Sequence, residues 1–348
     1  LKIGDLIAKL PIIQGGMGVG VSLSSLAGAV SAQGGIGVIS TAQIGYTEPE
    51  FYQNPLKANL KMIGEHIKRA RKIAPNGILG VNIMVATQNY ASYVKEAIKN
   101  GIDLIISGAG LPIELPSIAK GSQTKLVPIV SSLKAASILF KMWDKKDKVA
   151  PDAIIIEGPK AGGHLGFKPE ELDQMQQFQY DEEIKKIIAL TKDYEKKYDK
   201  TIPVVVAGGI ENKTDMEHYL SLGVDGIQVA TKFITTEECD ADIRFKEALI
   251  HCKEEDITIV KSPVGMPGRA IKNKFMERAA LSRIPVKKCY HCIIPCNPAT
   301  TPYCITDALI NAAKGNIDEA LLFCGANAYK ETRIRTVKEV LTDYFEIN

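Results

Sequence analysis

Short apolar runs recur along the first two thirds of the chain, and within each run apolar residues follow one another without polar alternation. They lie at residues 10–14, 36–40, 78–84, 104–110, 125–130, 153–157, 202–207 and 226–230. Runs of this kind are typical of parallel strands that are buried on both faces of a sheet. The pattern therefore predicts eight buried strands.

Helical patterns, with apolar residues three or four positions apart, separate most of the predicted strands. They cover residues 24–32, 56–73, 90–99, 134–143, 180–200 and 214–222. Strands that alternate with helices favour a parallel sheet, and eight such units are the number in a (β/α)8 TIM barrel. An open doubly wound sheet is the alternative, but no Gly-x-Gly-x-x-Gly motif with a downstream acidic residue opens the chain.

The expected domain division follows from the end of this alternation. We expect a barrel over residues 1–260, with helical insertions near 46–76 and 168–200, and a Cys-rich, mostly helical C-terminal cap over 261–348. A Pro/Gly-rich segment at 262–270 marks the passage between them. Helical patterns in the predicted cap lie at residues 305–314, 317–323 and 336–345.

One predicted helix, over residues 56–73, has a strongly basic face. This face could steer a phosphate toward a site, or it could be the solvated side of a surface helix. The second interpretation is favoured, because the apolar residues of the same segment recur at helical spacing. The basic residues are Lys57, Lys61, Lys68, Arg69, Arg71 and Lys72.

Composition narrows the function classes. The 348 residues are 45% hydrophobic, and 43 basic against 40 acidic residues give a net charge of only +3. This balance does not favour nucleic acid or an anionic membrane as a partner. No apolar run is long enough to span a bilayer, and no signal-peptide pattern begins the sequence. We expect a cytoplasmic protein with a small-molecule substrate; a homodimer is compatible with the sequence but not specified by it.

A glycine-rich loop directly follows the predicted strand at 153–157. It reads Glu157-Gly-Pro-Lys-Ala-Gly162-Gly163-His164. Paired glycines allow the backbone to approach a ligand closely, and a histidine beside them is suited to proton transfer near neutral pH. A tight turn whose histidine has only a structural role is the alternative.

The ends of the seventh and eighth predicted strands form a second candidate site. Gly208 and Gly209 end one strand, and Ala230 and Thr231 follow the other. In barrels, the loops after these strands commonly bind phosphate through backbone amides. We expect these four residues, including the Thr231 hydroxyl, to form a phosphate site, although two ordinary strand exits would also use glycine.

Taken together, the motifs resemble those of the nitronate monooxygenase (2-nitropropane dioxygenase) family, which includes flavin-type enoyl-acyl-carrier-protein reductases. The resemblance covers residues 10 to 275 in the expected order, and it implies a barrel that binds FMN non-covalently. The matching segments are Pro11 to Gly18, Gly80 to Met84, Glu157 to His164, Ala207 to Ile210 and Gly226 to Phe233.

The resemblance also assigns roles to individual residues. Gly16 and Met17 would lie against the isoalloxazine ring, Asn82 would hydrogen-bond to it, and His164 would be the catalytic acid/base. The remaining implied FMN-binding residues are Glu157, Gly162, Gly163, Gly208, Gly209, Gln228, Ala230 and Thr231.

Two positions depart from the pattern of many family members. Lys160 stands where many have glutamate, which changes the charge near the site. Ala230 precedes Thr231 where many have glycine, a change that backbone amides would tolerate.

Four cysteines cluster in the predicted cap, at Cys289, Cys292, Cys296 and Cys304. In a cytoplasmic enzyme, such spacing favours a metal over disulfides. It resembles the cysteine run of the flavin and iron–sulfur 2,4-dienoyl-CoA reductases. We expect a [4Fe–4S] cluster that passes electrons to FMN, while His291 keeps a zinc site open. Buried reduced cysteines are the alternative.

Three functions follow from these patterns. The first is FMN-dependent oxidation of alkyl nitronates with O2. The second is NAD(P)H-dependent reduction of enoyl thioesters or quinones through FMN. The third is a flavin-free barrel that binds a phosphorylated ligand. We also expect Arg269 to meet an anionic substrate or pair with a carboxylate, and Tyr329 to reach the barrel mouth or pack in the core.

Overall fold

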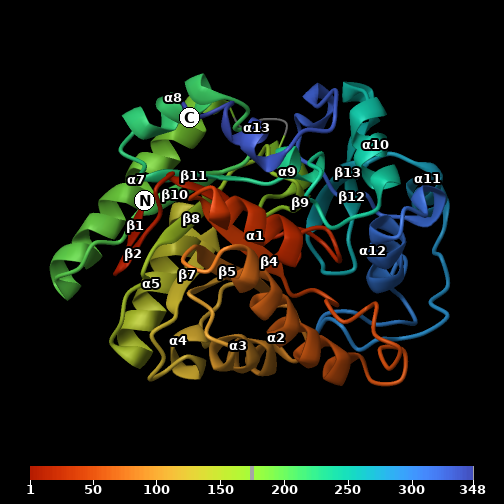
Figure 1. Cartoon of the computed structure of the whole chain (residues 1–348), viewed down its shortest axis with the longest axis horizontal. Helices are drawn as coiled ribbons and strands as arrows, with labels where there is room; N and C mark the ends of the chain where they lie inside the picture. The colour runs from red at the N-terminus through yellow and green to blue at the C-terminus, as the bar shows by residue number, and fades with distance from the viewer. Residues whose placement is uncertain (173–175, 348) are drawn as a thin grey trace.

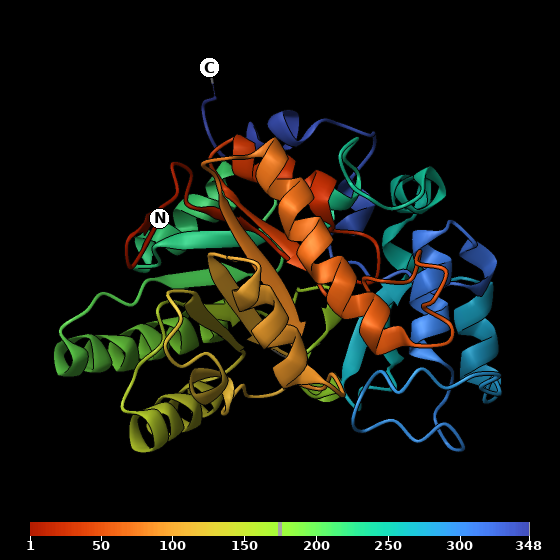
Figure 2. The same ribbon diagram turned by 60° about the horizontal axis from the view of Figure 1, so that its bottom comes forward.

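The computed structural model describes residues 1–172 and 176–347. Its centre is a closed barrel of eight parallel strands (Figures 1 and 2). This confirms the eight predicted strands and the (β/α)8 class. The barrel strands are β3 (Ile12–Gln14), β4 (Ile36–Ser40), β5 (Ile78–Met84), β6 (Leu104–Gly108), β7 (Lys125–Val130), β8 (Ile154–Glu157), β10 (Val204–Ala207) and β11 (Gly226–Val229).

Side chains of alternating direction explain why the strand sequences are apolar throughout. Along β8, Ile155 belongs to a cluster that fills the barrel interior. Its neighbours Ile154 and Ile156 belong to the larger cluster between the strands and the surrounding helices. All three are fully buried. Since both faces of the strand are covered, a polar residue on either face would lose its hydration.

Helices surround the barrel as the periodic patterns predict. Polar N-caps begin several of them: the side chains of Asn54, Ser132 and Asn212 accept hydrogen bonds from backbone amides of the first turn. The helices around the barrel are α1 (Ser24–Ala32), α2 (Pro55–Ile73), α3 (Tyr90–Lys99), α4 (Leu115–Ile118), α5 (Leu133–Asp147), α6 (Pro169–Leu172), α7 (Gln177–Tyr198), α8 (Lys213–Ser221), α9 (Thr231–Ile234) and α10 (Ile243–His251).

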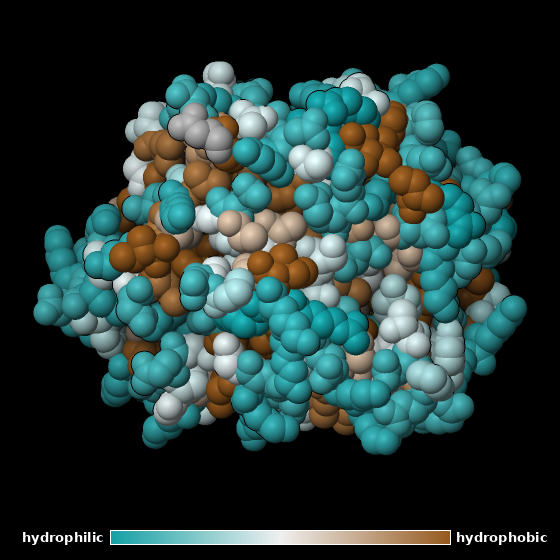
Figure 3. Space-filling view, viewed as in Figure 1, coloured by the Kyte–Doolittle hydropathy of each residue, from teal (hydrophilic) through white to brown (hydrophobic). Residues whose placement is uncertain are grey.

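The chain begins with a short hairpin, β1 (Lys2–Ile3) and β2 (Leu6–Ile7), which adds Ile3 to the interior cluster. In the described part of the chain, no helix has the length and apolar character needed to cross a bilayer. The face seen in Figure 3 is largely hydrophilic, with separate apolar patches among polar side chains.

The basic face of α2 is a solvated surface. Lys57 and Lys61 pair with Glu50 and Glu48, and each lysine side chain is more than half exposed. None of these side chains lines the large cavity described below. These ion pairs support the surface-helix interpretation rather than a phosphate-steering patch.

A second sheet, which the sequence pattern did not predict, packs beside the barrel. Its three antiparallel strands are ordered β12 (Ile257–Lys261), β13 (Pro267–Ile271) and β9 (Gly163–His164). Gly268 pairs with His164, and Arg269 pairs with Gly163. The sheet therefore connects the glycine-rich loop after β8 with β12 and β13, which include residues on both sides of the predicted domain boundary at 260/261.

The C-terminal region is the mixed cap seen mainly in blue in Figures 1 and 2. It contains α11 (Lys274–Leu281), α12 (Ile305–Ala313), η2 (Ile317–Glu319), η3 (Ala328–Lys330) and α13 (Val337–Leu341). The predicted helix at 317–323 is wrong. Only its first turn is helical, because the backbone of Leu322 and Phe323 pairs with β13 at Ile271 and Ala270.

Candidate functional site

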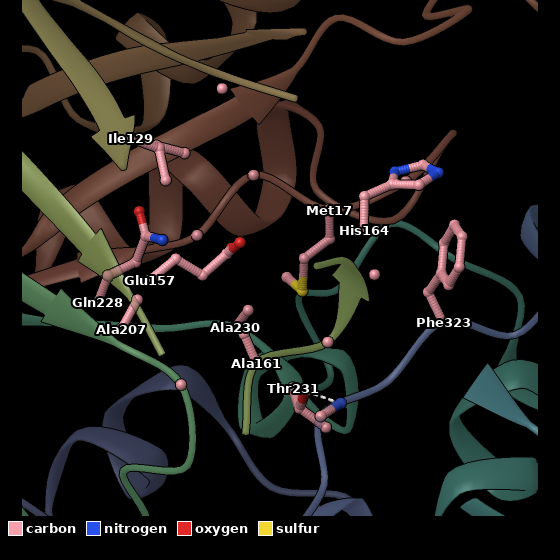
Figure 4. Close-up of a pocket in the computed structure, with 18 of the residues that line it drawn as sticks. Met17, Ile129, Glu157, Ala161, His164, Ala207, Gln228, Ala230, Thr231 and Phe323 are labelled. Carbon is pink, nitrogen blue, oxygen red and sulfur yellow. Dashed lines mark hydrogen bonds between the residues drawn. The ribbon is translucent and has the colours of Figure 1, made fainter. Parts of the chain in front are cut away.

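A cavity of about 360 Å3 opens at the carboxyl ends of the barrel strands (Figure 4). All predicted FMN-binding residues and His164 line it, although they come from the carboxyl ends of five different barrel strands and the loops that follow them. The structure thus brings these residues together as predicted. Their roles toward a flavin stay predictions.

His164 is held by the second sheet at the edge of the cavity. Its backbone pairs with Gly268, and its Nε2 lies 2.7 Å from the hydroxyl oxygen of Ser262. The ring of Phe323 meets the imidazole edge-on at 5.0 Å between centroids, and Figure 4 shows the two rings side by side. These contacts fix the ring in one orientation.

Burial sets the charge of this histidine. Desolvation lowers the pKa of His164 to about 4, and no charged group offsets the effect. The imidazole is therefore neutral at pH 7, and it meets a ligand as an uncharged hydrogen-bonding group rather than as a cation.

Two polar side chains, on strands β8 and β11, face the cavity without a hydrogen-bond partner among the residues that the structure describes. Burial raises the pKa of Glu157 to about 8, and the Oε1 atom of Gln228 has no hydrogen-bond partner among the described residues. Both are labelled in Figure 4, at the ends of β8 and β11. Since unpaired buried polar groups are costly, their presence indicates a ligand with hydroxyl or amide groups.

The predicted phosphate site lies where β10 and β11 end. Gly208 and Gly209 have φ of +101° and +78°, which a side chain would strain. The hydroxyl oxygen of Thr231 accepts a hydrogen bond from the amide of Gly325 at 2.8 Å. Its own proton is then available for a phosphate oxygen.

On the opposite side, the loop after β3 passes close to β5. A Cβ atom on Gly16 would lie 2.3 Å from the Cβ of Asn82, so glycine is required for this approach. The amide of Met17 donates to the hydroxyl of Ser22, which shapes the turn. Met17 is buried and lines the cavity.

The cap contributes residues that the sequence analysis missed. The amide of Ala326 donates to the carbonyl of Lys160, and Asn327 Nδ2 lies within hydrogen-bond distance of the Gly209 carbonyl. A Cβ on Gly162 would lie 2.4 Å from the carbonyl carbon of Cys324. Gly162 is thus required by the packing of the cap, whatever it contacts in a ligand. The turn around Gly325 was visible in the sequence, but it indicated no partner.

Three side chains differ from expectation or refine it. Arg269 is buried, and its guanidinium donates to the carbonyls of Pro159 and Ala161 in the glycine-rich loop at 2.8 and 2.5 Å. Tyr329 does not line the cavity and packs against the main core. Lys160 lines the cavity, and its aliphatic stem covers Gly209.

The predicted metal centre is not supported. Among residues 1–172 and 176–347, no group of three or more Cys, His, Asp or Glu side chains is arranged to hold a metal ion. Cys292, Cys296 and Cys304 are partly buried against an apolar cluster, and Cys289 is exposed. Burial raises the pKa of Cys304 to about 12, which favours the neutral thiol. This is the alternative of reduced, packed cysteines, and His291 joins no site.

The cavity fits FMN by its donor set. A flavin ring needs a flat slot with apolar walls, and a polyol needs side chains with unpaired polar atoms. A phosphate needs exposed backbone amides and a hydroxyl group. The loop at Gly16, the pair Glu157 and Gln228, and the strand ends at Gly208 and Thr231 supply these three environments around one cavity.

Comparison with known proteins supports this assignment. The model of the nitronate monooxygenase family matches residues 2–346. The chain is 26% identical over 293 residues to a probable nitronate monooxygenase of Staphylococcus aureus strain Newman, which covers 78% of each protein. The homologous protein of strain JH9 is 24% identical over the same length.

Two solved structures share the fold. FabK from Thermotoga maritima superimposes with a TM-score of 0.73 at 23% identity, covering 97% of this chain and 92% of FabK. Nitroalkane oxidase from Streptomyces ansochromogenes gives a TM-score of 0.71 at 19% identity, covering 97% and 95%. At these identities the likeness concerns the fold alone.

Proposed function

The chain belongs to the nitronate monooxygenase family of FMN-dependent oxidoreductases, and from this membership we propose that it oxidises alkyl nitronates with dioxygen. The observation that supports the proposal most directly is His164: a partly buried, neutral imidazole at the edge of a cavity that fits FMN. A nitronate is a small anion with an apolar alkyl group. A fixed imidazole beside apolar walls suits both parts.

In this proposal each part of the cavity has one task. FMN, when bound, supplies the electron transfer between substrate and dioxygen. Gly16, Met17 and Asn82 hold its ring, while Glu157 and Gln228 satisfy its polyol. His164 orients the nitronate, or removes the α-proton where the substrate enters as the neutral nitroalkane. The phosphate is held by Gly208, Gly209, Ala230 and Thr231, and Gly162 and Gly163 border the ribityl-phosphate arm.

The alternative is an NAD(P)H-dependent reductase of enoyl thioesters or quinones. It is favoured by the apolar wall that the cap adds to the cavity, where Leu309, Leu321 and Phe323 could accept an acyl chain. Electron delivery through an iron–sulfur cluster is no longer part of this alternative, because the described part of the chain holds no group of side chains arranged to bind a metal.

The test uses purified full-length protein. Extracted flavin is identified first, and then anaerobic flavin reduction is compared for an alkyl nitronate, NADH and NADPH. Nitronate oxidation predicts reduction by the nitronate and oxygen uptake without nicotinamide. Reduction by NAD(P)H alone would favour the reductase, and absence of bound flavin after reconstitution would contradict both.

His164→Ala tests the catalytic assignment in the same assay. We expect nitronate turnover to fall by about 100-fold, in the range of a lost acid–base group or of a lost charge-assisted hydrogen bond to the substrate anion. Flavin content should stay unchanged, because the ring lies at the edge of the cavity. Equal activity of the variant would contradict the role of His164.

A further inference from the structure

The hydroxyl of Ser262 lies within hydrogen-bond distance of one ring nitrogen of His164. Ser262 is buried at the end of β12, and its oxygen has two hydrogen-bond partners among the described residues: Nε2 of His164 at 2.7 Å and the amide of Val264 at 3.3 Å. The amide can only donate, so it occupies a lone pair of the Ser262 oxygen.

The remaining bond has two possible directions. If His164 donated from Nε2, the Ser262 oxygen would accept twice, and its own proton would have no acceptor among these partners. If Ser262 donates, both the hydroxyl and Nε2 are satisfied: the Ser262 oxygen accepts from Val264, and its proton is donated to the lone pair of Nε2. A neutral imidazole then carries its proton on Nδ1.

The surrounding structure holds this arrangement. The carbonyl of Lys261 accepts from the Tyr303 hydroxyl at 2.7 Å, and the amide of Gly265 donates to the carbonyl of Ser262. Gly265 has φ of +84°, which allows the tight turn into β13. The turn that carries Ser262 is thus fixed to the strand that carries His164.

We propose that Ser262 is a positioning residue that keeps the His164 proton on Nδ1, so that His164 donates a hydrogen bond to a substrate that enters as an anion. Nδ1 is the ring nitrogen without a partner in the described part of the chain, and His164 lines the cavity. This rests on the proposed function and names its substrate form. An Nδ1–H has no lone pair to accept the α-proton of a neutral nitroalkane, whereas it pairs well with a nitronate oxygen.

The test is 15N NMR of histidine-labelled, flavin-loaded protein, which distinguishes protonated from unprotonated ring nitrogens. We expect the Nδ1–H form in the wild type and a mixture of both forms in Ser262→Ala. Ser262→Thr keeps a hydroxyl and should restore the wild-type spectrum. Ser117→Ala, which removes a surface hydroxyl that bonds to Asp147, is the control.

Kinetics provide the second readout. Ser262→Ala should lower kcat/KM for a nitronate by about 10-fold, as expected for one lost hydrogen bond, with rescue by threonine. A preformed nitronate should react at least about 100-fold faster than the neutral nitroalkane, the factor that a working general base would otherwise supply.

The outcomes separate this inference from the proposed function. An Nε2–H form in the wild type, or a Ser262→Ala spectrum equal to that of the wild type, overturns the positioning role whatever the activity. Equal turnover of neutral nitroalkane overturns the anionic substrate. A confirmed Nδ1–H form that Ser262→Ala disturbs, in a protein that fails to oxidise nitronates, supports Ser262 and counts only against the proposed function.

Discussion

At the scale of single residues, Glu157 shows how a binding site reduces stability. Its folded pKa is about 8, against an ordinary value of 4.5. Because the pKa of Glu157 is raised in the folded state, its protonation contributes to the stability of the folded protein. This contribution is complete below pH 4.5 and is lost as the pH rises toward 8. Glu157 therefore destabilises the protein without cofactor at neutral and alkaline pH, where the buried carboxyl must either ionise or retain a costly proton.

Glu157→Gln tests this. The amide keeps the shape and cannot ionise, so the variant should gain stability over the wild type between pH 5 and 8. We expect about 2 kcal/mol at pH 8.5, less than the full shift in pKa implies because water can enter the cavity. Thermal midpoints of both cofactor-free proteins across this range measure the difference. Histidine titrations cancel in the comparison, and a difference independent of pH would contradict the argument.

Lys160 gives a second prediction at this scale. Its stem lies on Gly209, at the predicted phosphate end, and its ammonium forms no ion pair within the described residues. Lys160→Glu introduces the residue that is common in the family. It should weaken FMN binding by about tenfold, because the attraction between the ammonium and the FMN phosphate is replaced by a repulsion between the carboxylate and that phosphate.

The comparison ligand is riboflavin, which lacks the phosphate. Fluorescence titration of cofactor-free protein should show little change in riboflavin affinity for Lys160→Glu, and a smaller effect on FMN at high salt. Lys168→Glu, an exposed charge change in the same loop region, is the control. Equal weakening of both flavins would mean that Lys160 acts through packing.

At the scale of elements, β13 holds the glycine-rich loop in place. Its Arg269 donates from one nitrogen to the carbonyls of Pro159 and Ala161, while its backbone pairs with Gly163. Charge-assisted bonds to buried carbonyls contribute about 1.5–3 kcal/mol each, so their loss should loosen the whole loop.

Arg269→Gln should therefore lower FMN affinity about tenfold or more and destabilise the protein by about 2 kcal/mol. Hydrogen exchange followed by mass spectrometry should show faster exchange in peptides that cover residues 158–166. The same substitution at Arg283, which donates to the carbonyls of Pro298 and Thr301 in the cap, is the matched control. Unchanged exchange in the loop would contradict the holding role of β13.

The same elements show what the sequence could and could not predict. The barrel strands were recognisable because runs such as residues 153–157 are apolar on both faces. The β9–β13 pairing was not, because Gly163–His164 is two residues long and residues 267–271 begin Pro-Gly-Arg. Pairing of such short segments is decided by tertiary packing. For the same reason the spacing of Cys289 to Cys304 suggested a metal, although their burial in an apolar cluster could be seen only in the fold.

At the scale of the whole molecule, the cap contributes residues to the cavity at the barrel's carboxyl end. Beyond the β9–β13 pair, Thr87 forms a bridge with Ile293, and the Tyr344 hydroxyl donates to the carbonyl of Ile210. Lys232, buried beside Thr231, pairs with Asp343 at 2.7 Å. The predicted domain division at 260/261, the homodimer and the cytoplasmic location stay predictions. The contacts between cap and barrel bear on the domain division.

We expect one cooperative unfolding transition. Trp143, the only tryptophan in the sequence, is fully buried in α5 on the barrel side, so its fluorescence reports unfolding of the barrel. Release of FMN reports the shared cavity, and far-UV circular dichroism reports all helices. Because removing cap contacts exposes the loop at Gly163 and the strand ends at Ile210 and Thr231, the three thermal curves should coincide. A fragment of residues 1–260 should fail to retain FMN. An early loss of flavin or of helix content while the Trp143 signal persists would mean that the cap unfolds independently.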